Sequence, residues 1–358
     1  MRTTRAPGAL AVPPTPAAES ELDEILSRPR AETIAALEEC AGDVVVLGAG
    51  GKMGPTLTRL VVRAADSADQ RRARPPRRVT AVSRFSSAPA RRALEEAGVA
   101  TISCDLLDRG AVARLPDAPN VIFMAGQKFG TADAPAMTWA MNTIVPAVCA
   151  ERYAGARIVA FSTGNVYPLT PVARGGARET DAVGPVGEYA ASCVGRERIF
   201  ELAADRDRTR VALVRLNYAI DLRYGVLTDL AIKILQGDPV DLRMGHVNVI
   251  WQGDANRIAV ECLPRVSAPP FVVNVTGRAV LSVRELATQL AGRLGRAAIF
   301  SGDEAADALL SDTTRMASVF APPEIPLEWM LTWVAEWVRA GRPLLGRPTH
   351  FDERAGRF

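Results

Sequence analysis

Short apolar runs rich in β-branched residues recur between residues 43 and 275, each bounded by glycine, proline or polar residues. Such runs predict strands that are buried on both faces. They are DVVVLG (43–48), RVTAVS (78–83), VATIS (99–103), NVIFMAG (120–126), RIVAFS (157–162), RVALVRL (210–216) and FVVNV (271–275). Helical patterns fall between them, at 52–65, 134–152, 188–204 and 253–263. This alternation predicts a doubly wound α/β domain built on a parallel sheet, of the Rossmann type.

Beyond residue 218 the alternation loosens into helical patterns near 225–236, 282–294 and 326–339, separated by loops that contain Pro and Gly. We expect a smaller C-terminal substrate domain there. The predicted organisation is a flexible N-terminal extension with a helix (1–42, with 1–18 disordered), a dinucleotide-binding domain (43–217, with 246–276 returning to it), the substrate domain (218–245 and 277–345) and a tail (346–358). A tryptophan stripe at i, i+4 and i+8 predicts helix packing or a subunit contact; it consists of Trp329, Trp333 and Trp337.

Composition narrows the class of protein. Hydrophobic residues make up 48% and charged residues 23% of the chain, which is typical of a globular protein, and no apolar run approaches the roughly 20 residues that span a bilayer. The N-terminus has no continuous apolar segment, so we expect a cytoplasmic protein with no membrane partner. The net charge is +3, and the basic stretch at 71–78 carries no aromatic residue, which favours a solvated loop over a nucleic-acid site.

The cysteines and histidines argue against a metal site, and the lysines are notable for their rarity. The five cysteines form no Cys-x-x-Cys pair and read as buried small side chains, and only His246 and His350 are present, so we expect no metal site. Among 43 basic residues, lysine occurs only at Lys52, Lys128 and Lys233. Lysines in so arginine-rich a chain suggest a need for a compact ammonium group.

The segment GAGGKMG directly follows the first predicted strand and precedes an apolar helix. Glycines there allow a tight turn and a close approach of a pyrophosphate to the helix N-terminus, so the segment predicts a dinucleotide-binding turn. Its candidate cofactor-binding residues are Gly48, Gly50, Gly51, Lys52, Met53 and Gly54. The second strand ends in Ser83 and Arg84 rather than in an acidic residue, which favours the 2′-phosphate of NADP over NAD unless Arg84 is simply solvated.

Several motifs in sequence order resemble the extended short-chain dehydrogenase/reductases, the family of NAD-dependent epimerases and dehydratases, over about residues 43–340. They are GAGGKMG, CDLLD, FMAGQKFG, MNT, FSTGNVYP and RLNYAI. The resemblance implies further cofactor-binding residues, namely Asp105, Leu106, Ala125, Gly126, Lys128, Asn142, Ser162 and Tyr189, and substrate-facing residues, namely Thr163, Asn165 and Asn217. It also implies a homodimer.

The segment GEYAASCVGRERIFE carries the candidate chemistry. Hydride transfer at a carbinol carbon needs an acid/base on its oxygen and a hydroxyl that orients it, and Tyr189 and Thr163 offer both. The family places lysine four residues after this tyrosine, where this chain has Cys193. Arg196 shares the same helix face, and with Lys128 it is a candidate to replace the missing charge. The alternative is that Arg196 is an ordinary surface residue or forms an ion pair with the nearby glutamates.

Cys193 is predicted to be a buried thiol, with a redox or nucleophilic role as the alternative.

A later segment, GHVNVIWQGDAN, lacks the arginine with which related epimerases bind a nucleotide diphosphate. Trp251 in this segment is either a stacking platform for a sugar or a core residue. These features predict an NAD(P)-dependent oxidoreductase or epimerase acting on a sugar-like polyol, with or without a nucleotide. The alternative is an inactive NAD(P)-binding regulator or scaffold.

Overall fold

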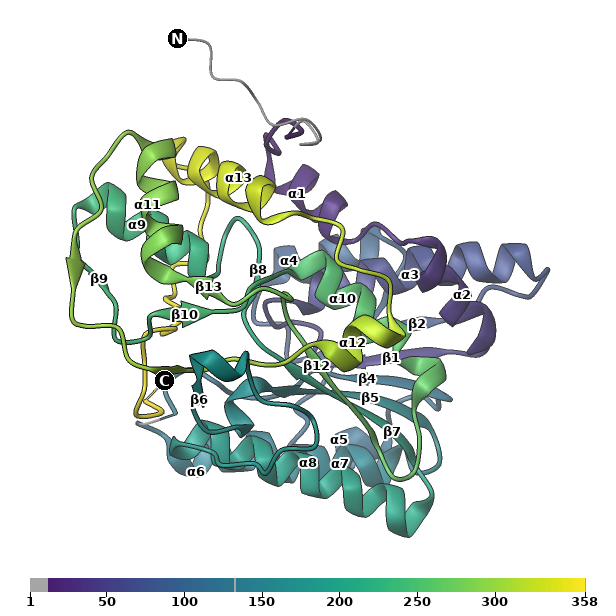
Figure 1. Cartoon of the computed structure of the whole chain (residues 1–358). Coiled ribbons are helices and arrows are strands. Elements are labelled where there is room, and N and C mark those ends of the chain that lie inside the picture. The colour runs from purple at the N-terminus through teal and green to yellow at the C-terminus, as the bar shows by residue number, and fades with distance from the viewer. Residues whose placement is uncertain (1–11, 132, 358) are drawn as a thin grey trace.

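The computed structural model describes residues 12–131 and 133–357, and its centre is a seven-stranded parallel sheet (Figure 1). The strand order is β12-β7-β5-β4-β1-β2-β3. The strands are β1 (Val44–Leu47), β2 (Val79–Ser83), β3 (Ala100–Ser103), β4 (Asn120–Phe123), β5 (Arg157–Thr163), β7 (Arg210–Leu216) and β12 (Phe271–Val275). All seven predicted strands are in this sheet, and the predicted doubly wound α/β fold is confirmed.

Strand alternation places apolar side chains on both faces of the sheet. In β1, Val44 and Val46 pack into the core on one face, while Val45 and Leu47 pack into the core on the other. Against the first face pack α2 (Ala31–Glu39), α3 (Gly54–Arg71), α4 (Ala88–Glu96), α10 (Gln252–Glu261) and α12 (Thr314–Val319). Along the second lie α5 (Arg109–Ala113), α6 (Pro135–Trp139), the π-helix η1 (Ala140–Ile144), α7 (Val145–Arg152) and α8 (Gly187–Asp207).

The order of the strands determines where a ligand can bind. From β1 the chain continues to β2 and β3 on one side and then returns to β4 on the other side of β1. The loops after β1 and β4 therefore leave the sheet in opposite directions and open a crevice at the carboxyl ends of the strands. The predicted cofactor turn follows β1, and the Ala125–Gly126 turn follows β4, so both lie at this crevice.

A second hydrophobic core lies beside the carboxyl ends of the sheet strands and is built on α9 (Val226–Gln236), α11 (Val283–Leu294) and α13 (Leu327–Arg339). The tryptophan stripe packs within it, with Trp333 and Trp337 buried. Short strand pairs complete this part of the chain: β6 (Thr170–Pro171) with β15 (Asp307–Ala308), β8 (Ala219–Ile220) with β11 (Ile250–Trp251), β9 (Val240–Asp241) with β14 (Phe300–Ser301), and β10 (His246–Val247) with β13 (Leu281–Ser282). The 3-10 turns are η2 (Gly164–Val166), η3 (Val172–Arg174) and η4 (Leu263–Arg265).

The N-terminal segment differs from expectation. The helix α1 (Glu19–Leu26) buries Leu22 and Leu26 in the second core. Ahead of it, the carbonyl of Pro13 accepts a hydrogen bond of 2.9 Å from the indole of Trp333. Residues 12–18 are therefore packed in place rather than disordered, because α13 offers them an apolar surface; the remaining predicted disorder, at residues 1–11, lies outside the described residues.

The basic stretch at 71–78 is also more structured than predicted. Arg77 is buried in an ion pair with Asp69 and donates to the carbonyls of Leu37 and Cys40, so it ties α2 to α3 instead of facing solvent. All five cysteines are buried thiols, as expected. None of the helices in the described part of the chain is both long enough and apolar enough to span a bilayer.

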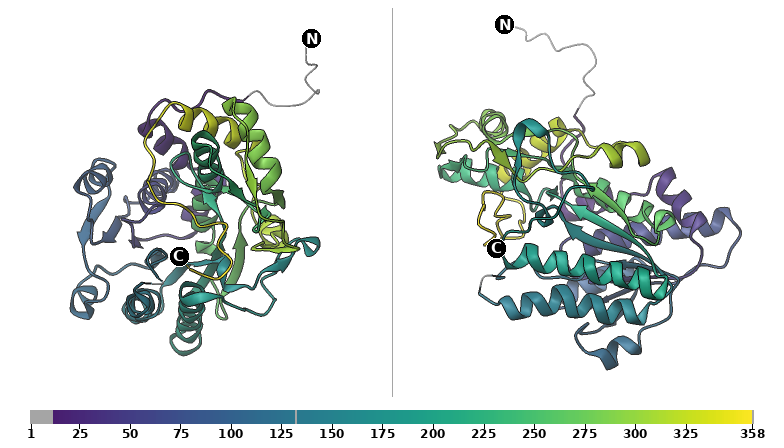
Figure 2. Two further views of the ribbon diagram at one scale, coloured as in Figure 1. Left: turned by 90° about the vertical axis from the view of Figure 1, so that its left-hand side faces the viewer. Right: turned by 60° about the horizontal axis from the view of Figure 1, so that its bottom comes forward.

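After α13 the chain continues as a tail, residues 342–357, without regular secondary structure. The tail runs from α13 past the second core to the N-terminal end of α8, where the chain ends close to α6 (Figures 1 and 2). It thereby passes next to Lys128, whose Nζ donates to the Thr349 carbonyl.

Candidate active site

The turn after β1 has the geometry of a phosphate cradle. Gly48 adopts φ 88°, and a Cβ at this position would lie 2.5 Å from the backbone nitrogen of Ala125. A Cβ on Gly54 would lie 2.2 Å from the Ala49 carbonyl oxygen, so both positions require glycine. No side chain among the described residues caps the first turn of α3, whose N-cap is Met53. The Gly54 N–H bonds to the Gly51 carbonyl and Pro55 has no N–H, so an anion such as a dinucleotide pyrophosphate would be held by the other N–H groups of the turn and of the helix N-terminus.

The candidate residues for the adenosine half lie at the ends of β2 and β3. A Cβ on Gly50 would lie 2.5 Å from Oγ of Ser83, so this hydroxyl is directly beside the turn. Arg84 and Asp105 are exposed, and the Asp105 carboxylate accepts a hydrogen bond from the backbone N–H of Leu107. Leu106 is buried beneath them. The chain thus presents a guanidinium at β2 and a carboxylate at β3 to the same edge of the crevice.

The structure brings Tyr189 and Thr163 together although they are distant in sequence. Thr163 ends β5, and Tyr189 lies in the first turn of α8. The Tyr189 hydroxyl shares hydrogen bonds with the side chains of Thr163 and Cys193. Burial raises the pKa of Tyr189 far above its ordinary value, and the positive charge of Arg196 acts in the opposite direction. In this arrangement Tyr189 is a protonated phenol.

Cys193 fills the space beside Tyr189 and is completely buried. Burial raises the pKa of its thiol, while the charges of Arg196 and Lys128 lower it. A thiol with a raised pKa is a poor nucleophile, because the thiolate is the reactive form. The environment therefore favours the packing interpretation of Cys193 over the redox one.

Arg196 is a buried residue beneath the turn that follows β4. Its guanidinium donates to the Phe161 carbonyl (2.9 Å) and to Oδ1 of Asn142 (2.6 Å). A Cβ on Gly126 would lie 2.3 Å from its Nη2 atom, so the guanidinium lies directly under this exposed glycine. The alternative ion pair of Arg196 is not observed, since the neighbouring glutamates pair with Arg215 and Arg198.

Asn142 requires a correction. It lies in the π-helix η1, and its amide oxygen accepts from the Gln127 backbone and from Arg196, while its amide nitrogen donates to the Gln127 carbonyl and to Oγ of Ser192. Both acceptor and both donor positions of the amide are occupied. The Asn142 side chain therefore holds the Ala125–Gly126 turn in place and has no capacity left for direct binding of a cofactor.

Ser162 also faces away from the crevice. Its hydroxyl donates to Glu197, which forms a buried ion pair with Arg215 at 2.7 Å. Ser162 contacts the middle of α8 through Glu197, whereas Thr163, the last residue of β5, contacts Tyr189 in the first turn of that helix. The Ser162 hydroxyl is part of the support for α8 and not of the predicted cofactor site.

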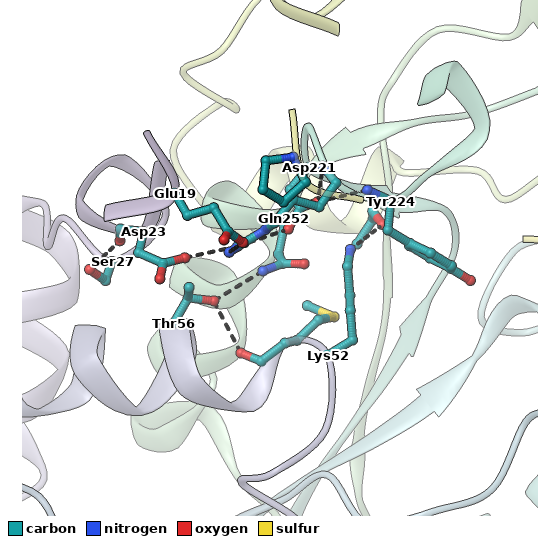
Figure 3. Close-up of polar contacts among 12 residues, drawn as sticks. Glu19, Asp23, Ser27, Lys52, Thr56, Asp221, Tyr224 and Gln252 are labelled. Carbon is teal, nitrogen blue, oxygen red and sulfur yellow. Dashed lines mark hydrogen bonds and ion pairs between the residues drawn. The ribbon is translucent and has the colours of Figure 1, made fainter. Parts of the chain in front are cut away.

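Lys52 and Lys128 both reach the crevice. Figure 3 shows Lys52 extending from the cofactor turn to the side of Tyr224, where its Nζ donates to the Ala219 carbonyl (3.2 Å) and lies 4.8 Å from the Tyr224 ring centroid. Lys128 donates to the Thr349 carbonyl of the tail at 3.2 Å. Burial lowers the pKa of each lysine to about 8.

The three remaining candidates for substrate contact divide into two groups. Asn165 donates to Oγ1 of Thr163 at 3.0 Å, and Asn217 packs against Gly164, so both lie at the end of β5 and β7 near Tyr189. Trp251 is 2% exposed and packs edge to face on Trp333 at 5.7 Å. It belongs to the second core, and the sugar-stacking role is incompatible with this burial.

The tail and α9 contribute residues that the sequence analysis missed. Asp229, in the first turn of α9, accepts hydrogen bonds from the backbone and the hydroxyl of Thr349, and burial raises the pKa of its carboxyl group. Phe351 is buried, and its carbonyl accepts from the Tyr218 hydroxyl. The tail has no periodic pattern that would have predicted this path; its only signal is the isolated Phe351 in a polar segment.

No protein-family model and no curated protein sequence matches this chain. Solved structures do match. MoeE5 in complex with UDP-glucuronic acid and NAD aligns with a TM-score of 0.68 and 20% identity over 84% of this chain and 100% of its own. UDP-glucose 4-epimerase from Thermotoga maritima aligns with a TM-score of 0.66 and 17% identity over 84% and 99%, and UDP-glucuronic acid 4-epimerase from Bacillus cereus with 0.67 and 14% over 83% and 99%.

These alignments extend over nearly the whole of each solved chain, so they include the second core as well as the parallel sheet. At such identities the similarity concerns the arrangement of the elements. This chain therefore has the fold of the NAD-dependent UDP-sugar epimerases.

Proposed function

We propose that this chain is an NAD(P)-dependent oxidoreductase or epimerase that acts on a sugar or a sugar-like polyol. The observation that carries the proposal is the hydrogen-bonded pair of Tyr189 and Thr163 at the same crevice as an uncapped, glycine-lined turn. Proteins of the same fold supply a second support, because MoeE5 and the UDP-glucuronic acid 4-epimerase from Bacillus cereus were solved with NAD and a UDP-sugar.

The residues present fit a dinucleotide, with the pyrophosphate on the turn at 48–54 and the nicotinamide half toward Gly126. The cofactor would supply the hydride acceptor. Tyr189 holds the proton that is exchanged with the reacting hydroxyl, and Thr163 orients that oxygen by its own hydrogen bond. Asn165, which bonds to Thr163, is the candidate for substrate contact at the end of β5, whereas Asn217 is 2% exposed and donates to the Leu309 carbonyl. Arg196 bonds to Asn142, lies directly under Gly126 and adds positive charge beneath the site.

The missing lysine is replaced in this proposal by charges from other elements. A cation near Tyr189 is needed because the phenolate must be stabilised for the proton to leave. Arg196 acts on Tyr189 from within α8, and Lys128 acts on the neighbouring Cys193 from the segment after β4. Arg196 and Lys128 thus take the place of the single lysine that the family has four residues after the tyrosine.

The test is an assay of the purified full-length protein with NAD and NADP over a panel of sugars, sugar acids, cyclitols and UDP-sugars, which detects both cofactor reduction and epimerised product. Turnover of any member supports the proposal. A dinucleotide-binding regulator is the second candidate, favoured by Cys193 and by the raised pKa of Tyr189. NAD(P) binding without turnover across the panel would favour the regulator.

Arg84→Ala is expected to weaken NADP binding about tenfold while NAD binding changes little. The exposed guanidinium of Arg84 follows Ser83 at the end of β2, where a 2′-phosphate would lie, and a charge-assisted hydrogen bond contributes about 1.5–3 kcal/mol. Dissociation constants of both cofactors for wild type and variant are measured by fluorescence titration. Equal losses for NAD and NADP, or no loss, would contradict the preference for NADP.

Cys193→Ser is expected to keep kcat within about tenfold of wild type. Serine preserves the volume and the hydrogen bond to Tyr189, and exchanging one such bond alters the energy by about 0.5–1.5 kcal/mol. Steady-state kinetics are compared with those of Cys149→Ser, a buried thiol between α7 and the sheet. Loss of all activity in Cys193→Ser with intact folding and cofactor binding would show that the thiol itself takes part in the chemistry.

Three further features belong to the proposal. The segments 43–217 and 246–276 serve the cofactor, and 218–245 with 277–345 serves the substrate. The protein is a cytoplasmic homodimer. A dimer is supported by the exposed apolar side chains on α6 and η1 beside α8, which are Met137, Trp139 and Ile144. Met137 and Ile144, seven residues apart, share one helical face, and exposed apolar side chains of this kind are typical of subunit contacts.

A further inference from the structure

Two lysines flank one aromatic wall in the crevice. The ring centroids of Phe129 and Tyr224 lie 6.4 Å apart in an edge-to-face arrangement. Nζ of Lys52 lies 4.8 Å from the Tyr224 centroid, and Nζ of Lys128 lies 5.6 Å from the Phe129 centroid. Figure 3 shows the half of this wall that faces the cofactor turn. The two ammonium groups, which are remote in sequence, therefore converge on the same short stretch of surface.

This wall lies between the cofactor turn and the acid/base. Lys52 is part of the turn itself, and its side chain is directed to the Ala219 carbonyl, at the side of the second core. Lys128 follows Gly126 by two residues, and its charge acts on Cys193, the neighbour of Tyr189. Both lysines are candidate cofactor-binding residues, and a sugar whose reacting carbon is at Tyr189 would lie next to the same stretch of surface.

The Lys52 ammonium group donates to the Ala219 carbonyl, and the Lys128 ammonium group donates to the Thr349 carbonyl. Burial lowers the pKa of each to about 8, and the positive charge of Lys52 lowers that of Lys128 further. Two half-buried cations that repel one another are costly to hold in a folded protein. An anion between them relieves both the repulsion and the desolvation.

Two carboxylates face the lysine pair. Asp221, beside Lys52, is shared with Arg223 in an ion pair, whereas Asp229, beside Lys128, accepts from Thr349 of the tail and offsets part of the Lys128 charge. On the tail side, the ring of His350 and the guanidinium of Arg347 face Phe129 at 6.4 Å and 5.9 Å. The titratable and charged groups around the pair are Cys193, Asp221, Arg223, Tyr224, Asp229, Arg347 and His350.

The distribution of lysine along the chain also favours an anionic ligand at this pair. Two of its three lysines form this pair, and the third, Lys233, pairs with Asp352 of the tail at 3.2 Å. Ion pairs elsewhere in the described chain, such as Arg91–Glu95 and Arg293–Glu328, use arginine. Lysine offers a compact charge with three rotatable donors, which suits a ligand oxygen better than a rigid planar group does in a narrow crevice.

We infer that the substrate carries an anionic group on the sugar itself, a carboxylate or a phosphate, which binds between Lys52 and Lys128 along the Phe129–Tyr224 wall. This inference rests on the proposed function, because it assigns the substrate class of the same site. A neutral sugar would leave the two ammonium groups on their present carbonyl partners. A sugar acid or a sugar phosphate replaces those bonds with charge-assisted ones.

The test measures binding to the full-length protein loaded with NAD by isothermal titration calorimetry. The probes are glucose, glucuronate and glucose 6-phosphate, with UDP-glucose and UDP-glucuronic acid as a second matched pair. We expect each probe with an anionic sugar to bind at least about tenfold more tightly than its partner with a neutral sugar, the diphosphate being the same in the UDP pair, and the two anionic free sugars show whether a carboxylate or a phosphate is preferred. Lys52→Met and Lys128→Met should each remove most of that advantage, while Lys233→Met, the matched control, should preserve it.

The pH dependence has a defined sign. Lysines with a pKa of about 8 are charged at pH 7 and lose their protons as the pH rises above 8, so the advantage of the anionic probes is present at pH 7 and lost by pH 9.

Equal binding of neutral and anionic probes, no detectable binding of any anionic probe, or equal losses for both classes in the lysine variants would overturn the inference. Separate NAD titrations of each variant exclude an indirect effect through the cofactor. Turnover of neutral sugars with no anion preference rejects only this inference, whereas anion binding without any turnover rejects only the proposed reaction.

Discussion

Tyr189→Phe is expected to lower kcat/KM at least about a hundredfold and to leave the dissociation constant of NAD(P) nearly unchanged. General acid/base catalysis contributes about 10²–10⁴ in rate, and this substitution removes only the hydroxyl that carries the proton. Tyr189 bonds to the side chains of Thr163 and Cys193, which are neutral and can rearrange without leaving a buried charge. The measurement is a comparison of steady-state kinetics and cofactor titrations for wild type and variant on whichever sugar the panel identifies.

Tyr153→Phe is the matched control for this prediction. The Tyr153 hydroxyl donates to the Pro116 carbonyl in the core on the α7 side of the sheet. Tyr153 undergoes the same change of residue type and is more buried than Tyr189. Its loss should reduce stability slightly and leave kcat/KM unaffected. Full activity in Tyr189→Phe would remove Tyr189 from the reaction, and an equal loss in both variants would indicate an effect on folding.

Glu197→Ala is expected to reduce the free energy of unfolding by about 3–5 kcal/mol, because it leaves a buried arginine without its counter-charge. Glu197 and Arg215 are 1% and 6% exposed, and the guanidinium donates to both carboxylate oxygens at 3.0 and 2.7 Å. Ser162 donates to the same carboxylate, and Arg215 also donates to the Tyr167 hydroxyl at 2.6 Å. The pair thus joins α8, which carries Tyr189, to β5 and β7.

Chemical denaturation measures this loss, and Glu201→Ala on the same helix is its control. Glu201 pairs with Arg198 at the surface, where the side chains are 32% and 57% exposed, and such pairs contribute at most about 1 kcal/mol. The difference between the two variants isolates the effect of burial. Similar small losses in both would contradict the structural importance of the Glu197–Arg215 pair.

The order of strands and helices and the position of the cofactor turn follow from the sequence alone. Strands of a parallel sheet that is buried on both faces consist of continuous apolar runs. Each strand can therefore be predicted from a few consecutive residues. The glycines of the turn are equally local, because the positive φ of Gly48 and the contact of Gly54 with Ala49 arise within the turn or next to it. Tyr189 and Thr163 are assigned to the site by motifs at strand and helix ends, and their meeting follows from the topology.

Contacts between distant segments are decided only by the tertiary structure. Trp251 and Asn142 both occupy positions that resemble family motifs. In the structure Trp251 packs on Trp333, and the Asn142 amide oxygen accepts hydrogen bonds from Gln127 and Arg196. The direction of Lys52 toward Tyr224 and the path of the tail over Lys128 have no periodic signal either. Periodicity specifies which face of an element is apolar, whereas the partner that meets a given side chain depends on how separate elements pack, and that information is spread over the whole chain.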